Sequence, residues 1–152
     1  MKKAFGAIVV LAMLTAAVFF GLGMYSQTGS PPGLQDGKLR PCPNSPNCVS
    51  SESAPSDDHA IAAISLSVPS GADPMIKVRD VVKFMGGEVL EGTDTYLATT
   101  FTSAIFGFVD DVEFRLDQGS NLIHVRSASR VGYSDFNANK QRVEQIRHLL
   151  TD

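Results

Sequence analysis

Two short segments in the second half of the chain carry the residue types best suited to chemistry. Asp110 and Asp111 are adjacent carboxylates in a β-prone stretch, and residues 126–135 are rich in arginine, serine and tyrosine. Arginine forks and tyrosine hydroxyls suit anionic or hydrogen-bonding ligands. Together with one arginine of the last helix, we expect these segments to form a binding corner. The candidate residues are Asp110, Asp111, Arg126, Ser127, Ser129, Arg130, Tyr133, Asp135 and Arg142.

Catalysis is the weaker interpretation of this corner. Asp110 and Asp111 are neighbours, so on a strand their side chains point apart and cannot form a close acid/base pair. A nucleophilic serine within 127–129 would need a nearby base, yet His124 faces the other side in the register derived below, and the chain has no Gly-x-Ser-x-Gly elbow. Whether the chain is an enzyme stays open, and a hydrolase using this Ser/Asp corner is one alternative. A buried ion-pair network that fixes the corner is the simpler explanation of the same residues.

Two long strands should position the corner. Residues 108–117 and 120–129 alternate apolar with polar positions, as half-buried strands do. Between them, residues 118–119 (Gln-Gly) form the short connection that favours a tight two-residue hairpin. The pattern therefore predicts an antiparallel pair with one apolar face.

The expected turn also fixes a register, because it sets Asp117 opposite Ser120. Counting back along both strands places Asp110 opposite Ser127 on the apolar face. A carboxylate there is costly unless it meets a cation or several donors, or unless a bulge turns it outward. The same count pairs Phe114 with Ile123, Val112 with Val125, Glu113 with His124 and Asp111 with Arg126.

The remaining periodic segments complete the expected fold. Residues 62–68 alternate like a strand, and 73–85 show helical spacing after an Asp-Pro start. Residues 88–91 and 95–103 are short β-rich runs that suit a hairpin, and a last helical stripe follows Asp135, a candidate N-cap.

This order, β-α-β-β-β-β-α, predicts an α+β fold. We expect an antiparallel sheet of about five strands with two helices packed on one face. The opposite face should be solvated or should be the surface on which a ligand lies. The apolar connection 103–108 is expected to plug the core.

The N-terminus has the features of a membrane segment. From Ala4 to Tyr25 the chain carries no charge, and Lys2 and Lys3 precede this run. About 20 apolar residues span a bilayer, and the basic flank stays in the cytoplasm. We expect a membrane anchor with the domain on the extracytoplasmic side. Glycines at 21 and 23 keep a cleaved signal peptide, and therefore secretion, as the alternative.

Export changes the meaning of the two cysteines. Cys42 and Cys48 lie close together in a segment rich in proline and asparagine, and an oxidising compartment favours their pairing. A zinc site would need about four ligands, and the three histidines are scattered. Redox dithiols use Cys-x-x-Cys spacing, which is absent here. We expect a structural disulfide, no metal and no cofactor.

Composition and the positions of proline, serine and glycine divide the chain into three parts. Residues 1–25 form the anchor or signal, 26–58 read as a Pro/Ser/Gly-rich tether with the cysteine loop, and 59–152 form the α+β domain. The formal net charge is −3, from 13 Lys and Arg against 16 Asp and Glu. This balance offers no long-range attraction for phosphate backbones, so nucleic acid is an unlikely partner.

Three motifs resemble a known family. Residues 42–51 (CPNSPNCVSS), 106–115 (FGFVDDVEFR) and 126–135 (RSASRVGYSD), followed by Asn139, are similar to domain-of-unknown-function family 1499 (DUF1499). The resemblance runs from about Leu39 to the C-terminus, in matching order. Members of that family commonly follow a membrane or targeting segment, and no established activity carries over from them.

These observations converge on an exported, membrane-tethered module of a bacterial-type envelope. We expect a non-catalytic role in which the corner binds a small polar or anionic ligand or a membrane-protein partner. The alternatives are the hydrolase named above and a purely structural envelope protein.

Overall fold

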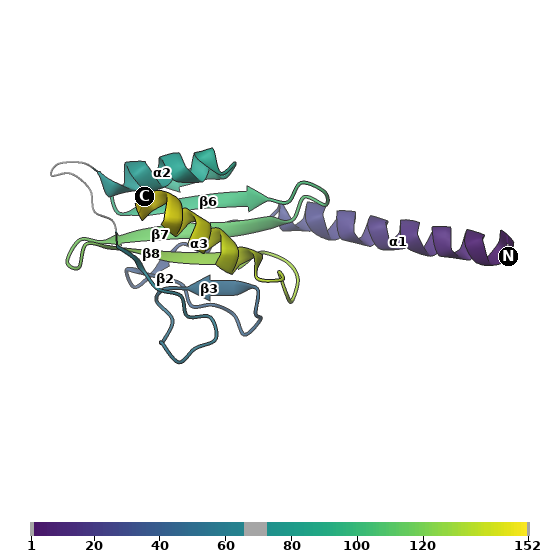
Figure 1. Ribbon diagram of the computed structural model, residues 1–152, viewed down its shortest axis with the longest axis horizontal. Coiled ribbons are helices and arrows are strands. Elements are labelled where there is room, and N and C mark those ends of the chain that lie inside the picture. The colour runs from purple at the N-terminus through teal and green to yellow at the C-terminus, as the bar shows by residue number, and fades with distance from the viewer. Residues whose placement is uncertain (1, 66–72, 152) are drawn as a thin grey trace.

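The computed structural model describes residues 2–65 and 73–151. It shows the expected α+β fold, with a long N-terminal helix projecting from one end of the domain (Figure 1). The elements are α1 (Lys2–Ser26), β1 (Leu34–Gln35), β2 (Lys38–Leu39), β3 (Cys48–Ser50), β4 (Ile64–Ser65), α2 (Pro74–Phe84), β5 (Glu88–Gly92), β6 (Tyr96–Thr102), β7 (Val109–Asp117), β8 (Leu122–Ser129) and α3 (Ala138–Thr151).

The main sheet is antiparallel and has six described strands, one more than expected. Its order is β3-β8-β7-β6-β5, and β4 pairs with β8 beside β3. The additional strand, β3, comes from the segment that the sequence assigned to a tether, since three residues are too few to show a periodic pattern. The strand expected over 62–68 is described only as Ile64–Ser65, and its residues 66–68 lie outside the described part of the chain.

Helices α2 and α3 cover one face of this sheet, as expected. The Asp73 side chain accepts a hydrogen bond from the Met75 amide and caps α2, with Pro74 in the first turn. Apolar side chains of both helices and of the sheet form a single core cluster, which includes Val78, Val82, Leu97, Val112, Phe114, Ile123, Val125, Val143, Ile146 and Leu150.

The β7–β8 turn differs from the expected two-residue hairpin. Asp117 pairs with Leu122, and Asn121 adopts a left-handed conformation with φ 56°. The Asp117 carboxylate accepts hydrogen bonds from the amides of Gly119 and Ser120 at 2.9 and 3.4 Å, and this side-chain cap favours a four-residue connection. The register is therefore shifted by two residues. The predicted pairs at 110–117 were wrong, although each residue kept its predicted face.

The shift replaces the cross-strand partners of the charged residues. Glu113 lies opposite Arg126 and not His124, and His124 lies opposite Arg115. Asp110 pairs with Ser129, Asp111 with Ala128, Val112 with Ser127 and Phe114 with Val125.

The irregular segment after α1 covers much of the second face of the sheet, which is therefore largely buried and not left to solvent. Leu39 of β2 packs with Tyr96 and Ala98 in a small buried cluster. Backbone amides of this segment also bond side chains at the sheet: Gly33 donates to Glu113, and Leu39 donates to Glu52. The polar alternation of β7 and β8 therefore marks a buried polar layer and not a water-facing surface.

The connection 103–108 is not in the core, contrary to the sequence-based expectation. The Phe106 ring lies 5.2 Å from the rings of both Phe19 and Phe20 in α1, and the Ile105 side chain is 73% exposed. The connection instead packs against the end of the N-terminal helix.

Candidate functional site

The nine candidate residues do not form one site, because the strands divide them between the two faces of the sheet. Asp110, Ser127 and Ser129 face α3, whereas Asp111 and Arg126 face the segment after α1. Adjacent residues of a strand point to opposite faces, so Asp110 and Asp111 each require a separate partner. The structure therefore builds two polar networks where the sequence suggested one.

The network beneath α3 is centred on an ion pair. Arg142 donates to the Asp110 carboxylate at 2.7 Å and to the side-chain Oδ1 of Asn139 at 2.7 Å. The Arg142 guanidinium also lies 4.9 Å from the centre of the Phe101 ring, a cation–π distance. Asp110 lies on the helix-covered face, where an unpaired carboxylate would be costly, and Arg142 supplies the compensating charge.

Asn139 connects this ion pair to both serines, although it was absent from the candidate set. Its side-chain Oδ1 accepts from the buried Ser127 hydroxyl at 2.5 Å. Its side-chain Nδ2 donates to Ser129 Oγ at 3.0 Å and to the backbone carbonyl of Asn47 at 3.1 Å. The one sequence signal for Asn139 was its place in the family-like motif. Asp135, four residues before Asn139, caps α3 by accepting from the backbone amides of Asn137 and Asn139.

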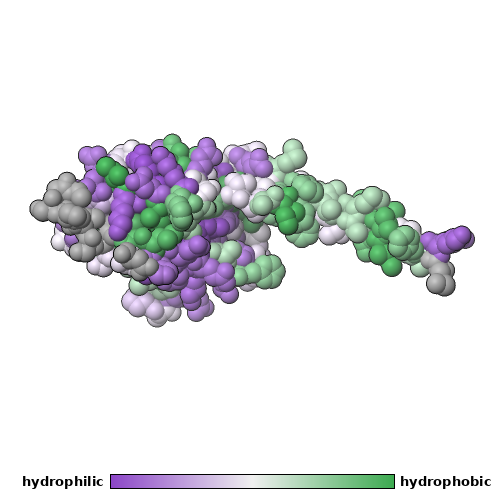
Figure 2. All heavy atoms as spheres, turned by 45° about the horizontal axis from the view of Figure 1, so that its top comes forward, coloured by the Kyte–Doolittle hydropathy of each residue, from purple (hydrophilic) through white to green (hydrophobic). Residues whose placement is uncertain are grey.

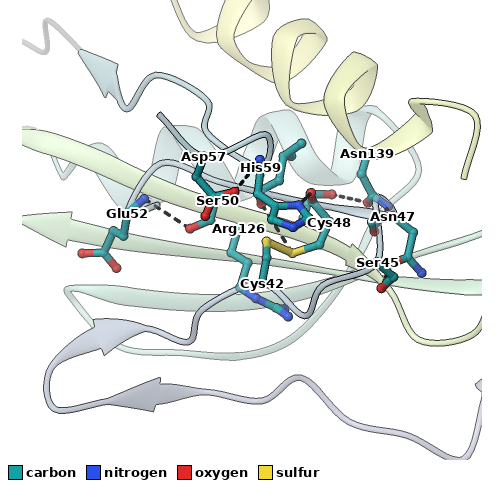
Figure 3. The surroundings of a disulfide bond; sticks show 12 residues. Cys42, Ser45, Asn47, Cys48, Ser50, Glu52, Asp57, His59, Arg126 and Asn139 are labelled. Atoms are coloured by element: carbon teal, nitrogen blue, oxygen red, sulfur yellow. Dashed lines mark hydrogen bonds between the residues drawn. A yellow bond between two sulfur atoms is a disulfide. The ribbon is translucent and has the colours of Figure 1, made fainter. Parts of the chain in front are cut away.

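Asn47 and the cysteine loop close this corner (Figure 3). Cys42 and Cys48 form the expected disulfide, and β3 begins at Cys48. Asn47 donates to the Gly132 carbonyl at 2.7 Å, and in Figure 3 its side chain lies beside Asn139. On the other side of the disulfide, His59 Nδ1 lies 3.0 Å from the Cys48 carbonyl. The loop therefore joins β3 to the start of α3.

The opposite face carries the second network, which begins at Arg130. Its guanidinium makes three short contacts with the Asp111 carboxylate, at 3.0, 3.0 and 2.7 Å, and donates to the Ser26 carbonyl at 3.2 Å. The side chains of Arg130 and Asp111 are 10% and 6% exposed. This buried pair holds the C-terminal end of α1 against the domain.

Glu113 and Arg126 continue the network toward the middle of that face. The Glu113 carboxylate is fully buried and accepts from Tyr96 Oη at 2.7 Å, the Gly33 amide at 2.8 Å and Arg126 Nη1 at 3.3 Å. Burial raises the pKa of Glu113 above its ordinary value, although the donors and the arginine charge act in the opposite direction. Burial and the contact with Glu113 also raise the pKa of Tyr96. The sequence did not reveal this cluster, because the predicted register paired Glu113 with His124 and because no register was predicted for β6, which carries Tyr96.

A pocket of about 300 Å³ opens beside the α3 network, at the junction with α1. Its polar lining includes Asp110, Ser129 and Asp135, and its apolar lining includes Phe19 and Phe108. Pockets with a mostly apolar wall and a few convergent polar groups are typical of small-molecule sites. This pocket is the strongest candidate site in the part of the chain that the structure describes.

Other candidate residues lie away from this pocket. Arg130 borders a separate pocket of about 370 Å³ on the other side of the junction, with Gln27, Glu88 and Thr100. Tyr133 is 75% exposed. A third pocket, of about 410 Å³, lies between the β1–β2 hairpin and the cysteine loop, and Cys42, Ser50 and Glu52 are among its lining residues.

The geometry does not support a serine nucleophile at the corner. Ser127 is fully buried and bonds Asn139, and His124 lies on the opposite face with Nδ1 3.2 Å from Ser51 Oγ. Neither corner serine therefore has the histidine that general-base activation would use. Among residues 2–65 and 73–151, no cluster of three or more His, Cys, Asp or Glu side chains is placed to hold a metal ion.

Comparison with known proteins places this geometry in one family. No protein with a curated description matches the chain. The family model described as "Protein of unknown function (DUF1499)" matches residues 38–150, which contain the cysteine loop, the described strands of the main sheet, α2 and all but the last residue of α3. The chain belongs to the DUF1499 family.

Proposed function

We propose that this protein is a non-catalytic, membrane-anchored module whose domain lies on the extracytoplasmic side and binds a small polar ligand in the pocket beside Asp110. Helix α1 is long and apolar enough to cross a membrane, and Lys2 and Lys3 stand at its start. The basic flank favours a cytoplasmic N-terminus, and the Cys42–Cys48 disulfide favours an oxidising compartment for the domain.

The pocket itself is the observation that carries the binding proposal. It is concave, it measures about 300 Å³, and it brings Asp110 and Ser129 together with an apolar wall. Polar groups at one side of an apolar pocket orient a ligand, while the wall removes its surface from water.

The charges at the corner favour a neutral polar ligand over an anionic one. The charge of Arg142 is already paired with Asp110, which lines the pocket, and Asp135 adds a second carboxylate to the lining. A further anion would face these two carboxylates, and the described residues that line the pocket include no cation to compensate it. A membrane-protein partner that inserts a side chain into the same pocket is the alternative occupant.

The test compares two phenylalanine substitutions on α3. Ala138 lines the pocket, so Ala138→Phe should fill it without removing any polar contact, whereas Lys140→Phe adds the same side chain at an exposed position of the same helix. The full chain, reconstituted in lipid nanodiscs, is screened by thermal shift against a library of sugars, polyols and amino acids. We expect at least one compound to raise the unfolding temperature of the wild type and of Lys140→Phe but not of Ala138→Phe. No stabilising compound, or equal stabilisation of all three proteins, would reject the pocket.

A structural role is the second candidate, and the pairing of the buried charges favours it. Asp110, Asp111 and Glu113 each contact an arginine, and the buried side-chain polar atoms left without a partner in the described residues are Arg115 Nε and Arg126 Nε. A network this complete can serve to fix the fold alone. The screen above separates the two candidates, because a structural module gives no pocket-dependent shift.

A further inference from the structure

The last turn of α1 makes close contact with the β6–β7 connection. Gly23 is buried, and a Cβ atom at that position would lie 1.7 Å from the Phe106 carbonyl oxygen, so no other residue fits without displacing the backbone. Ser26 Oγ donates to the Gly23 carbonyl at 2.6 Å and accepts from the Val109 amide at 3.1 Å. The domain is therefore docked directly on the end of the helix, with no flexible linker between them.

The connection also reaches back along the helix. Phe106 packs on Phe19 and Phe20, and the Phe108 ring lies 6.3 Å from that of Phe19. Phe19 precedes Ser26 by seven residues, which corresponds to roughly 10 Å along a helix at about 1.5 Å per residue. The aromatic contacts thus lie well inside the apolar part of α1.

The length of α1 places these contacts relative to a bilayer. A hydrocarbon core of about 30 Å takes up about 20 helical residues. If Lys2 and Lys3 mark one surface, the far edge of the hydrocarbon falls near Gly23, which puts Phe19 and Phe20 inside it. Figure 2 shows hydrophobic residues along α1 up to its junction with the domain. The Phe106 ring beside them must then share that apolar layer.

From this placement we infer that the β6–β7 connection is a second membrane contact, which inserts Ile105 and Phe106 into the outer leaflet of a phospholipid bilayer. Ile105 is 73% exposed, and burial in lipid accounts for a large apolar side chain at the tip of a connection. The inference rests on the membrane anchoring proposed above. Two attachments, one helix and one loop, fix the orientation of the domain. They also set the pocket beside Asp110, with Phe19 and Leu22 in its wall, at the level of the lipid headgroups.

The absence of tryptophan from the sequence allows a direct test. Single tryptophans are introduced by Ile105→Trp in the connection, Met13→Trp in the middle of α1, and Gln118→Trp in the β7–β8 turn. Positions 105 and 118 are exposed and flank opposite ends of the nine-residue strand β7, about 30 Å apart at about 3.3 Å per residue. Each full-length variant is reconstituted in liposomes whose phosphatidylcholine carries bromine atoms on the acyl chains, and quenching of tryptophan fluorescence is measured.

We expect strong quenching at position 13, at least half as much at position 105, and none at position 118. Quenching at 13 with a position 105 that behaves like 118 would overturn the loop contact and leave the membrane anchor intact. Contact with a protein partner would then be the remaining explanation for the exposed side chain of Ile105, because these liposomes contain no second protein that could cover it. A lack of quenching at 13 would overturn the anchor itself, and the loop contact with it.

Discussion

The two faces of the main sheet are both buried but are held in different ways. Under α2 and α3, fully buried Phe114 and Val125 and their neighbours form a continuous apolar core. Under the segment after α1, the buried side chains include the charged groups of Asp111, Glu113 and Arg126, beside a small apolar cluster of Leu39, Tyr96 and Ala98. An irregular segment offers free backbone amides, so it can cover carboxylates that a helix surface could not satisfy. The polar face of a sheet can therefore form part of the protein interior.

The largest expected effect is on the apolar face. Phe114→Ala removes the largest fully buried side chain and leaves a cavity, so we expect a loss of about 3–5 kcal/mol in the free energy of unfolding. Urea unfolding of the full chain in detergent micelles, followed by circular dichroism, measures it. Leu90→Ala, at a 45% exposed position of β5, is the control and should change stability by about 0.5 kcal/mol or less. A loss below about 1 kcal/mol for Phe114→Ala would show that this face is not the main source of stability.

A somewhat smaller loss is expected on the charged face. Arg130→Ala leaves the Asp111 carboxylate buried without its cation and removes the contact with Ser26, at an expected cost of about 3 kcal/mol in the same assay. The double variant Asp111→Leu with Arg130→Met should recover part of the loss, because it leaves no unpaired charge. If Arg130→Ala instead costs no more than an exposed pair, about 0.5 kcal/mol, the two faces do not differ as described.

The smallest expected effect is the pH dependence of stability that the buried Glu113 gives to the charged face of the sheet. Burial raises the pKa of Glu113, so the folded state holds that proton more tightly than the unfolded state does. The resulting stability is fully present below the unfolded pKa of about 4.3 and is lost as pH rises through the raised folded pKa. Glu113→Gln removes this titration, so its stability relative to the wild type should increase over that window.

The measurement is the unfolding temperature of both proteins in micelles between about pH 4 and 8, the range around the ordinary glutamate pKa. Glu144→Gln, at an exposed position of α3, is the control and should show a nearly constant difference from the wild type. A relative decrease for Glu113→Gln with rising pH would mean that the Tyr96 and Arg126 contacts outweigh burial.

Much of the fold and part of the candidate site could be predicted from local patterns. The helix capped by Asp73, the strands 108–117 and 120–129, and the disulfide all depend on residues close in sequence. The place of Asp110 on the helix-covered face followed from the alternation of one strand. Of the two arginines considered as its cation, Arg142 does pair with it, whereas Arg130 pairs with Asp111. The register failed because the Asp117 side chain, and not the Gln-Gly pair, determined the turn. Because the predicted register was wrong by two residues, the contact between Glu113 and Arg126 could not be predicted.

By itself, the sequence determined which residues alternate, where helices begin, which cysteines can pair and where an apolar helix stands, because each of these depends on neighbours within a few residues. Only the tertiary structure decided that the candidate residues separate into two networks, that residues 27–41 cover the second face, and that the connection 103–108 rests on α1. These contacts join residues far apart in sequence, from 19 positions for Asp111 with Arg130 to 104 positions for Ser26 with Arg130. They form only when the chain folds, and the hydrophobic periodicity of the sequence does not predict them.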